Sequence, residues 1–167
     1  MKRNYSLAAI ALLLSLFIYL FYRTEKTVAT EIFIRLVSPA TFHEWKNSLT
    51  HLLPLNEYSI YSLPEGLWVF AVTITSKPFF IKAGRLPFPL IYWPIFFAVG
   101  LEFLQLLHIS KGHFDPRDIA FSFIAWAVAG YGTGEQAPRQ PLFKPFTIHG
   151  LICIATFLLV YLAHVWD

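Results

Sequence analysis

The sequence predicts an all-α, polytopic membrane helix bundle, with about five transmembrane helices and one amphipathic extracytoplasmic helix in a single membrane domain. The first observation is composition: 56% of the 167 residues are hydrophobic and 18% are aromatic, with a mean hydropathy of +0.55. A soluble domain of this size could not bury that much apolar surface. The second observation is that the apolar residues form separate runs, which a few polar segments connect.

Five apolar runs predict the spans, at about residues 5–22, 64–82, 89–108, 116–132 and 148–165. The first run, Tyr5 to Tyr22, is longer than the core of a cleavable signal sequence, so we expect it to be retained. A bilayer core of about 30 Å needs roughly 20 helical residues, so the short second and fourth runs must recruit flanking residues or tilt little. A four-span alternative, in which Leu67 to Ile81 is re-entrant or interfacial, stays open.

Basic residues in the short loops predict the orientation. If the N-terminus is cytoplasmic, the inner segments hold most of the short-loop cations: Lys2, Arg3, Lys77, Lys82, Arg85, Arg139 and Lys144. The long segment 23–62 would then lie outside, with as many acidic as basic residues. Because positive charge in short loops marks the cytoplasmic side, we expect the N-terminus inside and the C-terminus outside. The net charge of +3 comes from scattered residues and gives no support for a nucleic-acid partner.

The outer segment 23–62 contains the predicted amphipathic helix. Ser38 and Pro39 make a helix start, and apolar residues then recur at helical spacing: Phe42, Trp45, Leu49, Leu52 and Leu53. Pro54 ends the pattern, and the opposite face is polar. We expect this helix to lie in the interface plane or to cover the outer ends of the spans. A lid over a lipid-facing site is the alternative.

A further helix start is predicted at Ser62-Leu63-Pro64-Glu65, which fits a capping box. In this motif the first and fourth side chains satisfy backbone N–H groups at the beginning of a helix. We therefore expect Ser62 to be the N-cap of the second span, and Glu65 to have a capping role rather than a catalytic one.

The most informative polar residues lie between the third and fourth spans. Glu102 and Gln105 are three residues apart, so they share one helix face near the outer end of the third span. A carboxylate facing lipid there would cost several kcal/mol, so we expect Glu102 to face the bundle or a wet crevice. Asp115, Pro116 and Asp118 fit the N-cap, first and third positions of a helix. Glu102 has no comparable local explanation.

No motif indicates a cofactor, and we expect none. Gly130, Gly132 and Gly134 follow an apolar helix rather than precede one, which is the wrong order for a phosphate-binding loop. His108 and His113 could join the nearby carboxylates around a metal ion, but their spacing matches no metal-binding signature, so no metal is expected. No nucleophile motif is present, so the sequence identifies no nucleophilic group. It leaves open whether the protein is an enzyme.

This region resembles the signature of VanZ-like membrane proteins, of which the chain would be a divergent member. The resemblance rests on Val99-Gly100-Leu101-Glu102-Phe103-Leu104-Gln105, on Gly112-His113-Phe114-Asp115-Pro116-Arg117-Asp118, and on Gly130 and Gly132. The family pattern is a Glu-x-x-Gln helix end, a short loop and a Phe-Asp-x-x-Asp helix start. The chain departs from it at Gly112, where the family often has Arg, and at Ser122, where it often has Asn.

The resemblance implies a multi-pass protein of the bacterial inner (cytoplasmic) membrane and cell envelope, linked to glycopeptide antibiotic resistance. It points to Glu102, Gln105, Asp115 and Asp118 as ligand-binding residues, with Glu102 and Asp118 as candidates for catalysis. The implied partners are membrane lipids, a lipid-linked or peptidoglycan-related ligand at the outer leaflet, and other membrane proteins. The alternative is a non-catalytic accessory subunit of a larger membrane complex, in which the same residues form a buried polar link between the third and fourth spans.

Overall fold

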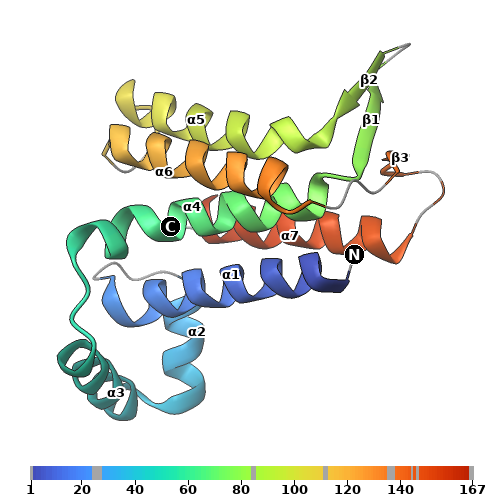
Figure 1. The fold of residues 1–167 in the computed structure, drawn as a ribbon. Helices are drawn as coiled ribbons and strands as arrows, with labels where there is room; N and C mark the ends of the chain where they lie inside the picture. Colours follow the sequence, from blue (N-terminus) through green and yellow to red (C-terminus); the bar gives the residue numbers. More distant parts are fainter. Residues whose placement is uncertain are drawn as a thin grey trace.

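Five helices lie side by side in the computed structural model, which describes residues 2–23, 28–83, 86–110, 113–134, 138–143, 145 and 147–165. They are α1 (Lys2–Tyr22), α4 (Glu57–Ser76), α5 (Trp93–Leu106), α6 (Pro116–Ala127) and α7 (Ile148–Val165). The chain reverses direction between successive members of α4 to α7, so their termini gather at two opposite ends of the bundle (Figure 1). The prediction of a mainly helical protein is confirmed.

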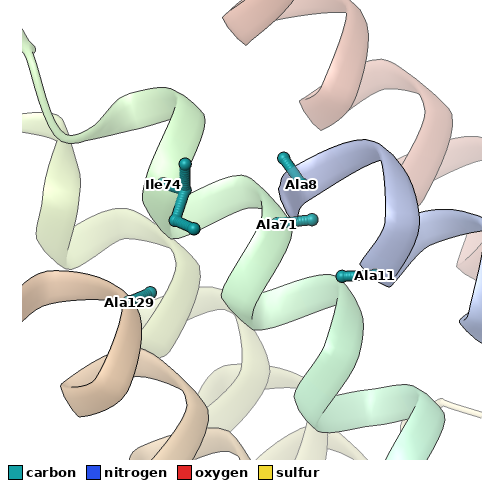
Figure 2. Close-up of a cluster of buried hydrophobic side chains, with 5 residues drawn as sticks. All are labelled: Ala8, Ala11, Ala71, Ile74 and Ala129. Carbon is teal, nitrogen blue, oxygen red and sulfur yellow. The ribbon is translucent and has the colours of Figure 1, made fainter. Parts of the chain in front are cut away.

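The central helix is α4, which packs against α1, α5, α6 and α7. Most of its residues from Ser62 to Ser76 are buried. Figure 2 shows one of the close contacts, in which five mostly small side chains meet: Ala8 and Ala11 of α1, Ala71 and Ile74 of α4, and Ala129 after α6. Small side chains let helix backbones approach closely, which is typical of helix packing in membranes.

Hydroxyl groups inside α4 bond mainly to other groups of the protein. Thr75 Oγ1 lies 3.1 Å from the carbonyl oxygen of Ala71 and 2.9 Å from Thr156 Oγ1 of α7. Ser76 Oγ donates to the carbonyl oxygen of Thr73 at 3.1 Å. Thr73 Oγ1 differs, since it has no partner in the described part of the chain. Because buried polar groups need such bonds, a helix rich in hydroxyl groups is stable at the centre of this bundle.

The second predicted span differs from α4 at both ends. The helix begins at Glu57, and its N-cap is Asn56, whose side chain accepts a backbone N–H of the first turn at 2.9 Å. The prediction of a capping box, with Ser62 as N-cap and Glu65 as its partner, is therefore wrong. The helix also ends earlier than expected, at Ser76, and a strand follows it.

Pro64 lies inside α4 rather than near its start. A proline in a helix interior lacks an N–H group and disturbs the carbonyl groups of the preceding turn. Two polar side chains at α1 bond to carbonyl groups around it: Ser15 Oγ donates to Pro64 at 3.2 Å, and Arg23 Nη2 donates to Tyr61 at 2.9 Å. The helix thus continues through a residue that locally signals a helix start, and two side chains from the α1 segment bond to the carbonyl groups of Pro64 and Tyr61.

A small sheet lies at the end of the bundle where α4 ends. β1 (Phe79–Ala83) pairs antiparallel with β2 (Leu86–Pro89) and parallel with β3 (Gln140–Pro141), in the order β2-β1-β3. A 3-10 turn, η1 (Leu90–Tyr92), then leads into α5, and a π-helical turn, η2 (Val128–Gly132), extends α6. The sequence pattern does not predict the sheet, because prolines in β2 weaken a strand pattern and β3 has only two residues.

Basic residues lie at the same end as the sheet. Lys77, between α4 and β1, donates from Nζ to Thr133 Oγ1 at 3.3 Å. Lys82 in β1 and Arg139 beside β3 are exposed. Two further cations of the predicted inner loops, Arg85 and Lys144, lie outside the described residues.

Two helices lie at the opposite end, α2 (Val28–Val37) and α3 (Pro39–Leu52) (Figure 1). The predicted amphipathic helix is α3, and its predicted N-cap is confirmed, since Ser38 Oγ accepts the Thr41 N–H at 3.4 Å. Its apolar face carries Phe42, which is buried among aromatic side chains of α1 and α2. The prediction of only one helix in this segment is wrong, because α2 precedes α3.

Within the described residues, one helical segment, Asn4–Tyr22, has the length and hydropathy of a membrane span. Two other helical segments, Leu90–Leu106 and Ile148–Tyr161, are apolar but shorter. Length and composition therefore do not establish the five-span arrangement, which stays a prediction.

Candidate functional site

Glu102, near the end of α5, is buried against the start of α6. Its side chain is only 4% exposed, and Oε2 accepts the backbone N–H of Asp115 at 3.0 Å. Gln105 donates from its amide to the His113 carbonyl oxygen at 3.0 Å and to Glu102 Oε1 at 3.3 Å, in the orientation that these acceptors require. The two side chains therefore fasten the end of α5 to the loop before α6. Gly112 of this loop lies outside the described residues.

Asp115 is the N-cap of α6, as predicted, and its Oδ1 accepts the Arg117 N–H at 2.9 Å. In a capping box, the side chain three residues later would accept the N–H of the N-cap residue. Here Glu102 accepts that N–H instead. Asp118 lies in the first turn of α6, as its predicted third position requires, but it forms no capping box with Asp115, because Glu102 accepts the N–H of Asp115.

Asp118 interacts with α4. Its carboxyl group is half-buried and hydrogen-bonded to Ser62. One of its oxygens, Oδ1, is buried without a hydrogen-bond partner in the part of the chain that the structure describes. Such an unpaired buried group lowers the stability of the fold by about 1–3 kcal/mol, so its presence needs an explanation. Among the acidic residues of this region, Asp118 is the one whose carboxyl group has a buried oxygen that accepts no hydrogen bond from the described residues.

Glu65, expected from the sequence to be a capping residue, lies inside α4 and belongs to the same region. It is 8% exposed, and its Oε2 accepts the Nε1–H of Trp68 at 2.8 Å. It also interacts electrostatically with Glu102 and with Asp118. The signal that identifies it is a carboxylate inside a run of mainly apolar residues, since ionisable groups at membrane depth are usually functional.

Acidic residues from three helices thus converge at the end of the bundle opposite the sheet. We call this group the acidic cluster: Glu65, Glu102, Asp115 and Asp118. Arg23 is close enough to interact with Asp118, while its guanidinium lies 4.1 Å from the centroid of the Tyr19 ring. Arg117 lies over the Tyr58 ring, 4.9 Å from its centroid. Like charges this close repel one another when ionised, so the acidic cluster favours a positive charge or a hydrogen-bond donor in its vicinity.

The histidines of the loop do not complete a metal site. Nowhere in the described ranges do three or more His, Cys, Asp or Glu side chains form a group that could hold a metal ion. His108 and His113 are exposed, and His113 contributes its backbone carbonyl to the contact with Gln105. The chemistry that the acidic cluster offers is acceptance of hydrogen bonds and attraction of positive charge.

Comparisons of the chain with protein-family models, with curated proteins and with solved structures find no match. In space, the two halves of the motif that resembles VanZ-like proteins meet where Glu102 binds Asp115.

Proposed function

We propose that the chain is a VanZ-like integral membrane protein of the bacterial cell envelope, whose acidic cluster binds or modifies a lipid-linked or peptidoglycan-related ligand at the outer leaflet. The observation that carries the proposal is the acidic cluster, in which Trp68 and the Asp115 N–H hold two carboxylates while Asp118 Oδ1 has no donor among the described residues. Carboxylates fixed in this way are pre-organised for a ligand. The link to glycopeptide resistance follows from the resemblance alone.

Exposed apolar side chains support a membrane location. Large hydrophobic residues that are each more than half exposed occur on four helices: Leu13 of α1, Phe96 of α5, Ile124 of α6 and Leu159 of α7. Soluble monomers rarely expose apolar surface over so many elements, whereas a bilayer would cover it. The 20 residues of α4 give a helix of about 30 Å, which matches the hydrocarbon thickness. We therefore propose five spans, with α4 enclosed by the other four.

The distribution of charge supports a cytoplasmic N-terminus. Lys77, Lys82 and Arg139 lie at the sheet end, where α1 also begins (Figure 1). Because basic residues in short loops favour the cytoplasmic side, the sheet would face the cytoplasm. The acidic cluster would then lie in the outer half of the membrane, with Glu65, the ninth of the 20 residues of α4, nearest its middle.

The charge of the acidic cluster limits which part of a ligand it would bind. Hydroxyl, amide and amine groups of a sugar-peptide head can donate hydrogen bonds to carboxylates. A pyrophosphate group would be repelled by the same carboxylates. We assign Asp118 as the contact residue, because it has the unused acceptor. Glu102 acts as a positioning residue, since its carboxylate holds the loop before α6.

Substituting Asp118 with asparagine tests the proposal. The amide keeps the size of the side chain and an oxygen for Ser62, but it removes the negative charge. We expect binding of a fluorescent lipid-linked disaccharide-peptide in nanodiscs to weaken by about tenfold, as when a charged hydrogen bond is lost. Sensitivity of cells to a glycopeptide antibiotic should shift toward that of a deletion strain, with the amount of protein in the membrane unchanged.

The matched control is Glu44→Gln, which removes a carboxylate from an exposed position of α3. We expect this variant to match the wild type in both assays. If Asp118→Asn also matches the wild type in ligand binding and antibiotic sensitivity, the proposed function is wrong.

A non-catalytic accessory subunit is the second candidate, and the contacts of Glu102 and Gln105 favour it. Both side chains bind the backbone of the loop that follows, which is the buried polar link expected of a structural role. This candidate predicts that fixed partner proteins co-purify with the chain after mild detergent extraction. A chain that elutes alone, stable and monodisperse would contradict it.

A further inference from the structure

The helix α2 carries an apolar stripe that is largely exposed. Ile32 and Leu36 are four residues apart, so they lie on the same face of the helix, and they are 55% and 78% exposed. Glu31 and Arg35 repeat this spacing one position earlier and are also exposed. Because neighbouring residues of a helix are about 100° apart around its axis, the charged pair lies on a different face. Helix α2 therefore turns one apolar face and one charged face away from the protein.

A third face of α2 packs on α1 and fixes the depth of α2. The ring centroids of Phe33 and Phe21 lie 6.1 Å apart, and Ile18 belongs to the same apolar cluster. Ile18 is four residues before the end of α1 at Tyr22, which is a distance of about 6 Å along the helix. In the proposed membrane arrangement, α2 therefore lies within about one helical turn of the outer end of the first span.

The direction of α2 differs from that of the spans. Figure 1 shows that α2 runs across the direction of α1 rather than along it. A helix that crosses the spans near their outer ends lies close to the plane of the membrane. Helices at a membrane interface combine an apolar face, which enters the bilayer by about 5–10 Å, with a charged face at the head groups. The faces, depth and direction of α2 all agree with this arrangement.

An aromatic side chain of α3 lies beside the same surface. Trp45 is 46% exposed, and its ring centroid lies 6.5 Å from that of Phe33. Tryptophan is enriched at the level of the lipid head groups, because its ring is apolar and its N–H group is polar. Trp45 thus supports an interfacial position for this surface.

The size of the apolar stripe favours a bilayer over a second copy of the chain. A helix of ten residues is about 15 Å long and about 10 Å wide. One of its faces offers far less than the roughly 800 Å² that each partner contributes to a stable protein interface. Lipid requires no minimum area, since each apolar side chain enters the bilayer independently.

We propose that α2 is an interfacial helix of the outer leaflet, with Ile32 and Leu36 among the lipid acyl chains and Glu31 and Arg35 among the head groups. This inference rests on the proposed membrane location of the bundle. It goes beyond the proposed function, because it assigns a lipid-binding surface outside the acidic cluster.

Spin labels on the full chain in liposomes of phosphatidylethanolamine and phosphatidylglycerol test the proposal. The label is attached at Ile32→Cys or at Glu31→Cys, and the native Cys153 is kept because its thiol is buried. Oxygen concentrates in lipid and a nickel chelate stays in water, so collisions with each report the surroundings of the label. We expect the ratio of oxygen to nickel collisions to be several-fold higher at Ile32 than at Glu31. Equal ratios would overturn the proposal.

Two neighbouring positions provide matched substitutions. Leu36→Gln places a polar group on the apolar stripe, whereas Arg35→Gln changes the charged face. With the label at Ile32, we expect Leu36→Gln to raise collisions with the nickel chelate several-fold and Arg35→Gln to leave them unchanged, because only the first weakens insertion. All of these positions are exposed, so the variants should fold. The same response to both substitutions would contradict the assignment of the faces.

A label at Leu159→Cys separates this inference from the proposed function. Leu159 of α7 is 57% exposed and lies on the bundle itself. If this label meets oxygen while the label at Ile32 meets the nickel chelate, the position of α2 is wrong and the membrane location stands. If both labels meet the nickel chelate, the membrane location is wrong, and the proposed function with it. A label at Ile32 that is shielded from both reagents would indicate a protein contact, such as a second copy of the chain, and would also overturn the proposal.

Discussion

Replacing Glu102 with alanine is expected to lower the free energy of unfolding by about 3 kcal/mol. The substitution leaves the partly buried Asp115 N–H without its acceptor and removes the side chain that joins α5 to the start of α6. A hydrogen bond to a charged group contributes about 1.5–3 kcal/mol, and an unsatisfied buried donor costs a similar amount. The change is measurable as denaturant-induced unfolding of the purified protein in one fixed detergent.

Glu102→Gln separates the hydrogen bond from the charge. Its amide oxygen can still accept the Asp115 N–H, so we expect a loss of about 1 kcal/mol or less. Glu31→Ala, at an exposed position of α2, serves as a control for removing a carboxylate and should have little effect. If Glu102→Ala is no less stable than Glu102→Gln, the contact with Asp115 does not fasten the two helices.

Replacing Gly66 with leucine is expected to destabilise the bundle by about 3 kcal/mol or more. A Cβ atom at Gly66 would lie 3.3 Å from the carbonyl oxygen of Phe121 and 3.6 Å from the Cβ of Ala125. The atoms beyond Cβ have no space, so α4 and α6 would have to move apart. Gly66→Ala adds only the Cβ atom and should cost far less, because a shift of a few tenths of an ångström relieves the contact.

Gly100 is the matched control for this prediction, since it is also a helical glycine, but no heavy atom of the described residues beyond its own helix backbone and chain neighbours lies within 4 Å of its Cβ position. Gly100→Leu should leave stability unchanged or raise it slightly, because leucine favours helix more than glycine does. Both variants can be compared by the same detergent unfolding measurement. Equal losses for Gly66→Leu and Gly100→Leu would mean that the close approach of α4 to α6 does not limit stability.

Local signals were sufficient to predict several elements of the fold. The Ser38-Pro39 start and the apolar spacing after it identify α3, because an N-cap acts through the backbone of its own first turn. Asp115 and Pro116 identify the start of α6 for the same reason. The apolar runs also indicate where the five long helices lie, although not that each one crosses a membrane.

Contacts between distant segments account for what the sequence could not predict. Ser62 and Pro64 have the same local pattern whether a helix begins there or continues, and here the helix begins six residues before Ser62, at the Asn56 N-cap, and bonds to α1 around Pro64. Likewise, the partner of Glu102 is a backbone N–H that is 13 residues away and has no sequence signature. Since Glu102 takes that N–H, Asp118 loses the capping role that its spacing predicts.

The enclosed position of α4 changes what hydropathy can report about a chain of this architecture. In the proposed membrane arrangement, α4 touches protein on its sides, and its hydroxyl and carboxylate groups find partners there rather than in hydrocarbon. Hydropathy then measures how much of a helix faces lipid, and not whether the helix crosses the bilayer. A small bundle built around a polar central helix will therefore show fewer apparent spans than it has crossings.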